Sequence, residues 1–291
     1  MHSYLRAVGF SDIKTKKEMD KILAEVIKDY DNKIVVEKDK SHLYAEISKS
    51  YGANSGITVW GEYDEDDIFQ MEYWYPYFQG SEISSREEVV IEKHAGKESY
   101  AGACEDVRVG VTLIFYLQNA GDYILEKGRE KFRKSEMTVS LSGLAKEGKI
   151  LLPLAKDEWN NNKTAPPMNS RNNLIAAARS GDEEAIENLT MEDIDTYTMI
   201  SRRILNEDVL SIVESYFMPY GMECDQYNIL GEIRELVQVE NAKTGEKMYQ
   251  LNMESNDICF DICINAKDLI GEPKVGRRFK GTVWLQGCVD F

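Results

Sequence analysis

The sequence predicts an α+β fold: a mainly antiparallel sheet with packed helices comes first, central helical hairpins follow, and a small β-barrel ends the chain. Strand-like runs separated by short turns fill most of residues 42–118, and strand patterns return after residue 222. Aromatic residues make up 10% of the 291 residues, and aromatic side chains favour strands. A chain of this length is expected to hold about two domains.

The first expected element is a helix that begins after Thr15. Thr15 and Glu18 have the spacing of a capping box, in which the hydroxyl and the carboxylate satisfy free backbone amides. The apolar residues that follow repeat at helical spacing: Met19, Ile22, Leu23, Val26, Ile27 and Tyr30. One face of this helix is therefore expected to be buried.

Strand-like runs follow the helix at residues 42–50, 57–63, 68–78, 88–93, 98–105 and 107–118. Their connections are too short for helical crossovers, so the sheet is expected to be mainly antiparallel. A helix near 120–132 and a strand near 137–141 complete a predicted α+β domain over residues 1–158.

Residues 159–170 have the composition of a linker, because they are polar and include the pair Pro166 and Pro167. The segment 171–221 then predicts helical hairpins, with possible caps at Ser180 and Asn206 and a last helix that includes Phe217.

The last predicted domain covers residues 222–291. Its expected strands are 228–240, 248–254, 258–265 and 278–290, with a short helix near 267–270. This spacing and the run VGRRFKGTVWLQG resemble an OB-type barrel.

Several stretches of the chain resemble an uncharacterised family of clostridial-type bacterial proteins. The stretches are MHSYLRAVGFSDI, ISRRI, SYFMPYGMECDQYNILGEI and GRRFKGTVWLQG, and together they span nearly the full length. This family has no assigned activity or catalytic residues, so the resemblance implies nothing about the chemistry of this chain.

The composition of the chain disfavours several classes of partner and location. The net charge of −16 disfavours nucleic acid overall, because phosphate backbones are bound largely through Lys and Arg. No apolar stretch approaches the roughly 18 residues of a membrane-spanning helix, and the start lacks the pattern of a signal peptide. The five cysteines are scattered, as expected of free thiols in a reducing compartment. We expect a cytoplasmic protein.

Residue types that ordinarily carry catalysis are few. Only His2, His42 and His94 could act as an imidazole base, and a Cys104–His94 pair would require adjacent strands to bring the two side chains together. Nucleotide loops and metal-ligand spacings are absent from the sequence, and the acidic run 64–67 is interpreted as a solvated turn. No catalytic residue, metal or cofactor is expected.

A basic cluster precedes the last strand. It consists of Lys274, Arg277, Arg278 and Lys280. Guanidinium groups suit phosphate or carboxylate recognition, so the cluster is a candidate anion site. The alternative is a set of internal salt bridges, which we favour.

An aromatic run is the second candidate site. Its possible interface residues are Trp74, Tyr75, Tyr77 and Phe78, which flank Pro76. Exposed aromatic side chains anchor protein interfaces, and proline in a strand indicates an edge. The alternative, which we favour, is an aromatic core between two covered faces of a sheet.

The first functional hypothesis is a non-catalytic interaction or scaffold protein whose partner is another protein. The second is a module that binds an anion or single-stranded nucleic acid through its C-terminal barrel. The third is a hydrolase that uses only carboxylates, because such chemistry leaves almost no signature in sequence.

Overall fold

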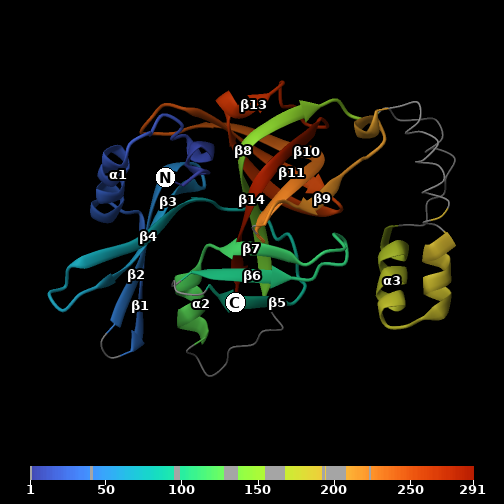
Figure 1. Cartoon of the computed structure of the whole chain (residues 1–291), viewed down its shortest axis with the longest axis horizontal. Helices are drawn as coiled ribbons and strands as arrows, with labels where there is room; N and C mark the ends of the chain where they lie inside the picture. The colour runs from blue at the N-terminus through green and yellow to red at the C-terminus, as the bar shows by residue number, and fades with distance from the viewer. Residues whose placement is uncertain are drawn as a thin grey trace.

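The computed structural model describes residues 2–39, 42–94, 99–127, 137–154, 168–191, 194, 208–222 and 224–291. Within these residues the chain is an α+β protein, as the sequence predicts, and it contains a four-stranded antiparallel sheet and a five-stranded barrel (Figure 1).

The N-terminal sheet is a simple antiparallel meander. Its strands, in spatial order, are β1 (Asn32–Asp39), β2 (His42–Gly52), β3 (Ser55–Tyr63) and β4 (Phe69–Phe78). Proline cannot donate to a sheet ladder, and Pro76 accordingly lies on the edge strand β4.

One face of this sheet is covered by helix α1 (Lys16–Lys28), as Figure 1 shows. The predicted capping box is confirmed: the Thr15 hydroxyl accepts from the Glu18 amide, and the Glu18 carboxylate accepts from the Thr15 amide. The apolar face of the helix shares a core with β2, β3 and the 3-10 turn η1 (Leu5–Val8). Burial of this apolar face stabilises the helix, because intrinsic helix propensity alone would not make a helix of this length stable.

The second sheet contains the remaining strands. They are β5 (Val89–Lys93), β6 (Tyr100–Cys104), β7 (Leu113–Leu117), β8 (Thr138–Leu151), β9 (Tyr216–Pro219), β10 (Gln226–Glu240), β11 (Lys247–Ser255), β12 (Ile258–Asn265), β13 (Leu269–Ile270) and β14 (Arg278–Asp290). Strands β5, β6 and β7 continue the sheet beyond β14, because β7 pairs with β14 in parallel.

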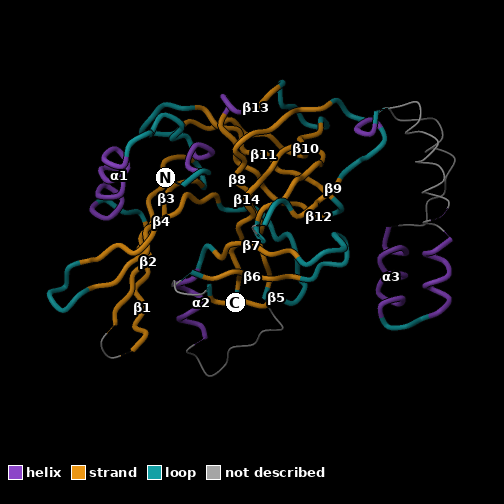
Figure 2. The backbone as a smooth tube through the Cα atoms, viewed as in Figure 1, coloured by secondary structure: helices purple, strands orange, loops and turns teal. Residues whose placement is uncertain are grey.

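The barrel closes through β8. Strands β10, β11 and β12 form an antiparallel meander, and β14 pairs with β10. Strand β8 then pairs in parallel with β12 and antiparallel with β14, which closes the ring (Figure 2). The segment 1–158 therefore supplies one strand of the barrel, and the segment 222–291 supplies the other four.

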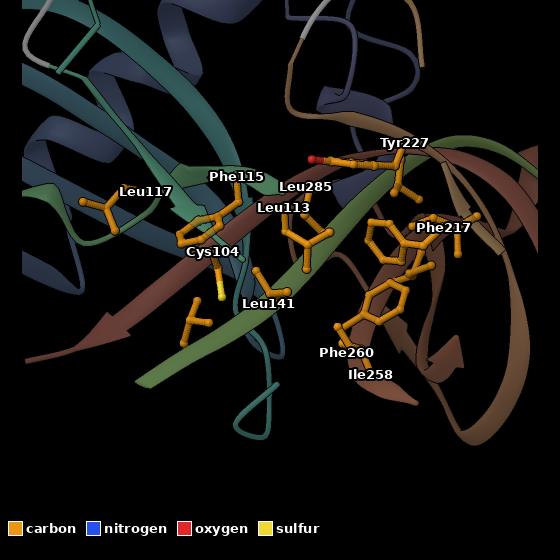
Figure 3. Packing of buried hydrophobic residues seen from close by; sticks show 14 of the residues in the cluster. Cys104, Leu113, Phe115, Leu117, Leu141, Phe217, Tyr227, Ile258, Phe260 and Leu285 are labelled. Carbon is orange, nitrogen blue, oxygen red and sulfur yellow. The ribbon is translucent and has the colours of Figure 1, made fainter. Parts of the chain in front are cut away.

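The barrel core is aromatic and aliphatic. The Phe217 ring lies 4.9 Å from that of Tyr227 and 5.4 Å from that of Phe260, between centroids. Figure 3 shows these rings on one side of Leu285 and Leu141, with Cys104 and Phe115 on the other. One buried cluster thus joins the barrel to β6 and β7.

The described helices after α1 are few, and residues 192–193 and 195–207 of the segment expected to form helical hairpins lie outside the described residues. These helices are α2 (Ala120–Lys127), α3 (Met168–Arg179), the helical residues 183–191, and the 3-10 turns η3 (Val209–Ser211) and η4 (Ala266–Asp268). Most of the expected linker 159–170 lies outside the described residues, and its last three residues begin α3. The sequence predicts a cap at Ser180. In the structure the helical residues 183–191 are capped by Asp182, whose carboxylate accepts from the Ala185 amide.

The helix expected to include Phe217 does not extend to it. The expected cap Asn206 lies outside the described residues, and within 208–222 the 3-10 turn η3 is followed by strand β9, which contains Phe217. Strand β9 pairs with residues Tyr227–Leu230 of β10, along the same edge as β11 but beyond its end, while β14 pairs along the other edge. Pairing there satisfies backbone groups of β10 and places Phe217 in the barrel core, which outweighs the local helical pattern.

Candidate functional site

The basic cluster does not present four free charges. Arg278 is buried at the start of β14, and its guanidinium donates to three backbone carbonyls, those of Leu152 at 3.1 Å, Leu210 at 2.8 Å and Val213 at 2.7 Å. Burial lowers the pKa of Arg278. This side chain ties the segment before β9 to the barrel.

Two further cations of the cluster share one carboxylate. The Lys274 ammonium lies 2.9 Å from Glu272, and the Arg277 guanidinium lies 3.7 Å from the same carboxylate. The hydrogen bond from Lys274 is the main cause of the lowered pKa of Glu272. Lys280, the fourth member, is half-buried on β14. An incoming anion would have to compete with Glu272.

The aromatic run divides between the two faces of β4. Tyr75 and Phe78 are buried, and the Tyr75 hydroxyl donates to the Gln118 carbonyl at 2.9 Å. Trp74 and Tyr77 are half-buried, and all four side chains belong to or pack against the buried cluster that includes α1. By the alternation of the strand, Trp74 and Phe78 lie on one face and Tyr75 and Tyr77 on the other.

His94 and Cys104 are not brought together. Cys104 pairs in register with Val89 at the start of β5, whereas His94 follows the end of β5. The Cys104 thiol contacts the Ser85 hydroxyl at 3.6 Å, and burial raises its pKa. A thiol with a raised pKa is a poor nucleophile at neutral pH.

The inner face of the N-terminal sheet, opposite α1, contains an aromatic row. The rings of Tyr44, Trp60 and Tyr73 stack across β2, β3 and β4 with centroids 6.2 and 6.4 Å apart. Tyr75 continues the row and lies 4.7 Å from the ring of Tyr116 on β7. This row packs the sheet against the barrel side of the molecule.

Glu46 interrupts this apolar face. It lies directly opposite Trp60 in the register of β2 and β3, and its carboxyl accepts a hydrogen bond from the Gly121 amide of α2 at 2.9 Å. Burial raises the pKa of Glu46 to about 8, and the charge of Asp122 adds to the shift. Glu46 is therefore largely protonated at neutral pH, although the Gly121 hydrogen bond favours the ionised form.

The surroundings of Glu46 contain other groups with raised pKa values. Burial raises the pKa of Asp122, and burial together with nearby Asp122 and Glu46 raises that of Cys288 to about 11. Such clusters occur at functional sites and also in structural cores. Within the described ranges, no group of acidic, histidine or cysteine side chains is placed to hold a metal ion.

The outer face of the same sheet extends beyond α1 at the ends of the two hairpins (Figure 1). Two neighbouring cross-strand rows form this part of the face, Leu43–Tyr63–Phe69 and Val35–Ala45–Gly61–Met71. We call Val35, Leu43, Tyr63, Phe69 and Met71 the outer apolar face. Val35, Leu43 and Met71 are 40%, 38% and 41% exposed, and the neighbouring Ile68 is 56% exposed.

The outer apolar face is closely packed. The Phe69 ring lies over Gly61, where an added Cβ would come within 2.6 Å of it. The Tyr63 and Phe69 rings are 5.4 Å apart between centroids. Contiguous exposed apolar side chains of this kind mark interaction surfaces in monomeric proteins.

Comparison with known proteins gives one family. Residues 5–287 match the model of DUF3881, described as a domain of unknown function with an E. rectale gene description. The chain belongs to the DUF3881 family. This family is uncharacterised and of clostridial origin, which confirms the resemblance noted in the sequence.

No curated protein and no solved structure matches this DUF3881 chain. None of its described helices is both long and apolar enough to span a membrane.

Sequence reasoning missed Glu46 and the outer apolar face. Glu46 looks like an ordinary exposed residue of an alternating strand, and only the cover of the inner sheet face, where α2 approaches, makes it unusual. The outer apolar face depends on where α1 ends above the sheet, which no local pattern encodes.

Proposed function

We propose that this DUF3881 protein is a non-catalytic interaction protein whose outer apolar face binds another protein. The observation that carries the proposal is the exposure of Val35, Leu43 and Met71 in neighbouring cross-strand rows of one sheet face. Apolar side chains at the centre of a docking patch supply most of the binding energy when a partner excludes water from them.

The other two hypotheses have less support. Anion binding by the basic cluster would require Lys274 and Arg277 to leave Glu272, and Arg278 is buried against carbonyls. A carboxylate-only hydrolase would have to use Glu46 and Asp122, and Glu46 is packed beside Trp60 and already bound to the Gly121 amide.

We also propose that the barrel is of OB type. Strands β10 to β12 provide the meander, the short turn η4 precedes β14, and β8 provides the remaining strand from an earlier part of the chain. Further proposals concern the central helices, which would form hairpins, and the location, which would be cytoplasmic. The absence of disulfides among all five cysteines supports the location.

The experiment places a photoactivatable amino acid at position 71 and cross-links the protein in native lysate. The proposal predicts one recurrent protein partner, which is lost when Leu43→Glu is combined with the probe. The matched control places the probe at Val237, a 53% exposed residue on the barrel strand β10. The proposal fails if position 71 gives no partner, or if both positions capture the same proteins.

A further inference from the structure

Acidic side chains border the outer apolar face on two sides. On the β1 side, the exposed Glu37 lies opposite Leu43 in the strand register. On the β4 side, the turn between β3 and β4 contains Asp64, Glu65, Asp66 and Asp67, all exposed. Exposed carboxylates therefore lie beside the apolar surface at the β1 edge and at the end of the β3–β4 hairpin.

The acidic turn is ordered by one of its own carboxylates. Asp64 accepts hydrogen bonds from the amides of Asp66 at 3.0 Å and Ile68 at 2.9 Å, and from the Gln70 side chain at 3.0 Å. The bond from Gln70 is the largest cause of the lowered pKa of Asp64. The turn thus holds a fixed shape beside Ile68.

The other carboxylates of the turn are available to a partner. Among the residues that the structure describes, no cationic side chain pairs with Glu65, Asp66 or Asp67. Lys33, a cation on the same face, donates to the Tyr63 hydroxyl at 2.6 Å and lies 4.8 Å from the centre of that ring. Lys33 is therefore engaged inside the face.

From this arrangement we infer that the partner docks a basic, amphipathic segment on the outer apolar face. Its apolar side chains cover Val35, Leu43 and Met71, and its Lys or Arg side chains meet Glu37 and the 65–67 carboxylates. This inference rests on the proposed function, because it names the chemistry of the partner at the same surface. Complementary charge at the border fixes orientation and accelerates association, while the apolar centre supplies affinity.

A second copy of the chain fits this surface poorly. In a two-fold dimer the same patch meets itself, so each acidic border would face the other. The net charge of −16 adds long-range repulsion between copies. The same repulsion applies to nucleic acid and to anionic lipid surfaces, so a basic protein segment is the occupant that the charges favour.

The test uses labelled peptides titrated with the full chain and followed by fluorescence anisotropy. A peptide of alternating Leu and Lys is compared with one of alternating Leu and Glu and one of alternating Ser and Lys. Only the Leu/Lys peptide is expected to bind, because it alone combines apolar contact with positive charge. Added salt is expected to weaken this binding, since the border charges are exposed.

Variants separate local docking from general attraction to an acidic protein. Leu43→Glu is expected to weaken Leu/Lys binding by about tenfold or more, and Val237→Glu, which adds the same charge on the barrel, by less than about twofold. Glu65→Lys combined with Asp66→Lys is also expected to weaken binding, with the apolar centre intact. Met71→Glu provides a second test of the centre if Leu43→Glu unfolds the protein.

Equal binding of the Leu/Lys peptide to Leu43→Glu and Val237→Glu would overturn the inference. So would a dimer that Leu43→Glu dissociates, because a second copy would then be the occupant. The proposed function can survive this failure: a cross-linked partner at position 71 whose docking segment is acidic or uncharged contradicts only the inference. If position 71 captures no partner at all, the proposed function fails with it.

Discussion

The carboxyl of Glu46 on β2 accepts a hydrogen bond from the amide of Gly121 at the start of α2, across the space between the N-terminal sheet and the helix. An added Cβ at Gly121 would lie 2.9 Å from Ile34 and 3.2 Å from the Glu46 carboxyl. Glycine at this position therefore allows the helix to approach β1 and β2 closely.

Stability is expected to fall as pH rises through the range in which Glu46 titrates. The folded protein keeps the proton up to about pH 8, whereas the ordinary pKa of 4.5 applies when the chain unfolds. Between these values the folded state binds more protons, so the free energy of unfolding decreases with pH. Glu46→Gln should remove this loss and stabilise the protein at pH 9 by about 1–3 kcal/mol.

Thermal unfolding of both proteins between pH 5 and pH 9 checks this prediction. Glu65→Gln is the matched control, because it makes the same chemical change at an exposed position in the β3–β4 turn, away from the sheet interior. Parallel pH curves for Glu46→Gln and the unmodified protein would contradict the assigned role of Glu46.

Arg278→Ala is expected to release the segment before β9. The change leaves three buried or half-buried carbonyl acceptors without their donor, which costs about 2–4 kcal/mol. Hydrogen exchange of residues 208–215 should increase more than that of β10. Arg277→Ala, one residue away, should have little effect on stability or on this exchange. Equal destabilisation by Arg278→Ala and Arg277→Ala would contradict the role assigned to Arg278.

The barrel is expected to need β8 for folding. A polypeptide of residues 208–291 alone should lack cooperative unfolding, because β12 and β14 would each expose an unpaired edge. Attaching residues 137–154 after residue 291 through a flexible linker should restore a cooperative transition, measured by circular dichroism. Cooperative unfolding of the shorter polypeptide would show that β8 is dispensable.

Cysteine reactivity should follow exposure. Cys224 is exposed, whereas Cys104 is buried with a raised pKa and Cys263 is buried against the Ala7 carbonyl. Alkylation at neutral pH, followed by peptide mass spectrometry, should modify Cys224 first and Cys104 only on unfolding. Rapid modification of Cys104 in the folded protein would revive the hypothesis of a Cys–His pair.

Local sequence patterns predict most of the described helices and strands, because helix capping and the alternation of apolar and polar residues depend on only a few neighbouring residues. The α1 cap at Thr15 and the strands β10, β11, β12 and β14 lie close to their expected positions. Strand β1 was missed, since its apolar core of Ile34, Val35 and Val36 is short and flanked by charged residues.

Long-range pairings were beyond the reach of sequence patterns. Nothing local indicates that β8 pairs with β12 in parallel, or that β9 covers the edge of β10 and places Phe217 in the core. The same limit applies to Arg278. The sequence offers it as part of a candidate anion site or of internal salt bridges, whereas its acceptors are carbonyls from distant segments.

The closure of the barrel by β8 also limits when the barrel can fold during synthesis of the chain. Strand β8 is synthesised well before β12 and β14, so during translation it lacks both of its main strand partners. The ring can form only after residue 290 has been made, and pairings this distant in sequence fold slowly. Newly made chains should therefore pass through an interval in which β8 is open to wrong partners, and chaperones that shield strand edges should raise the yield.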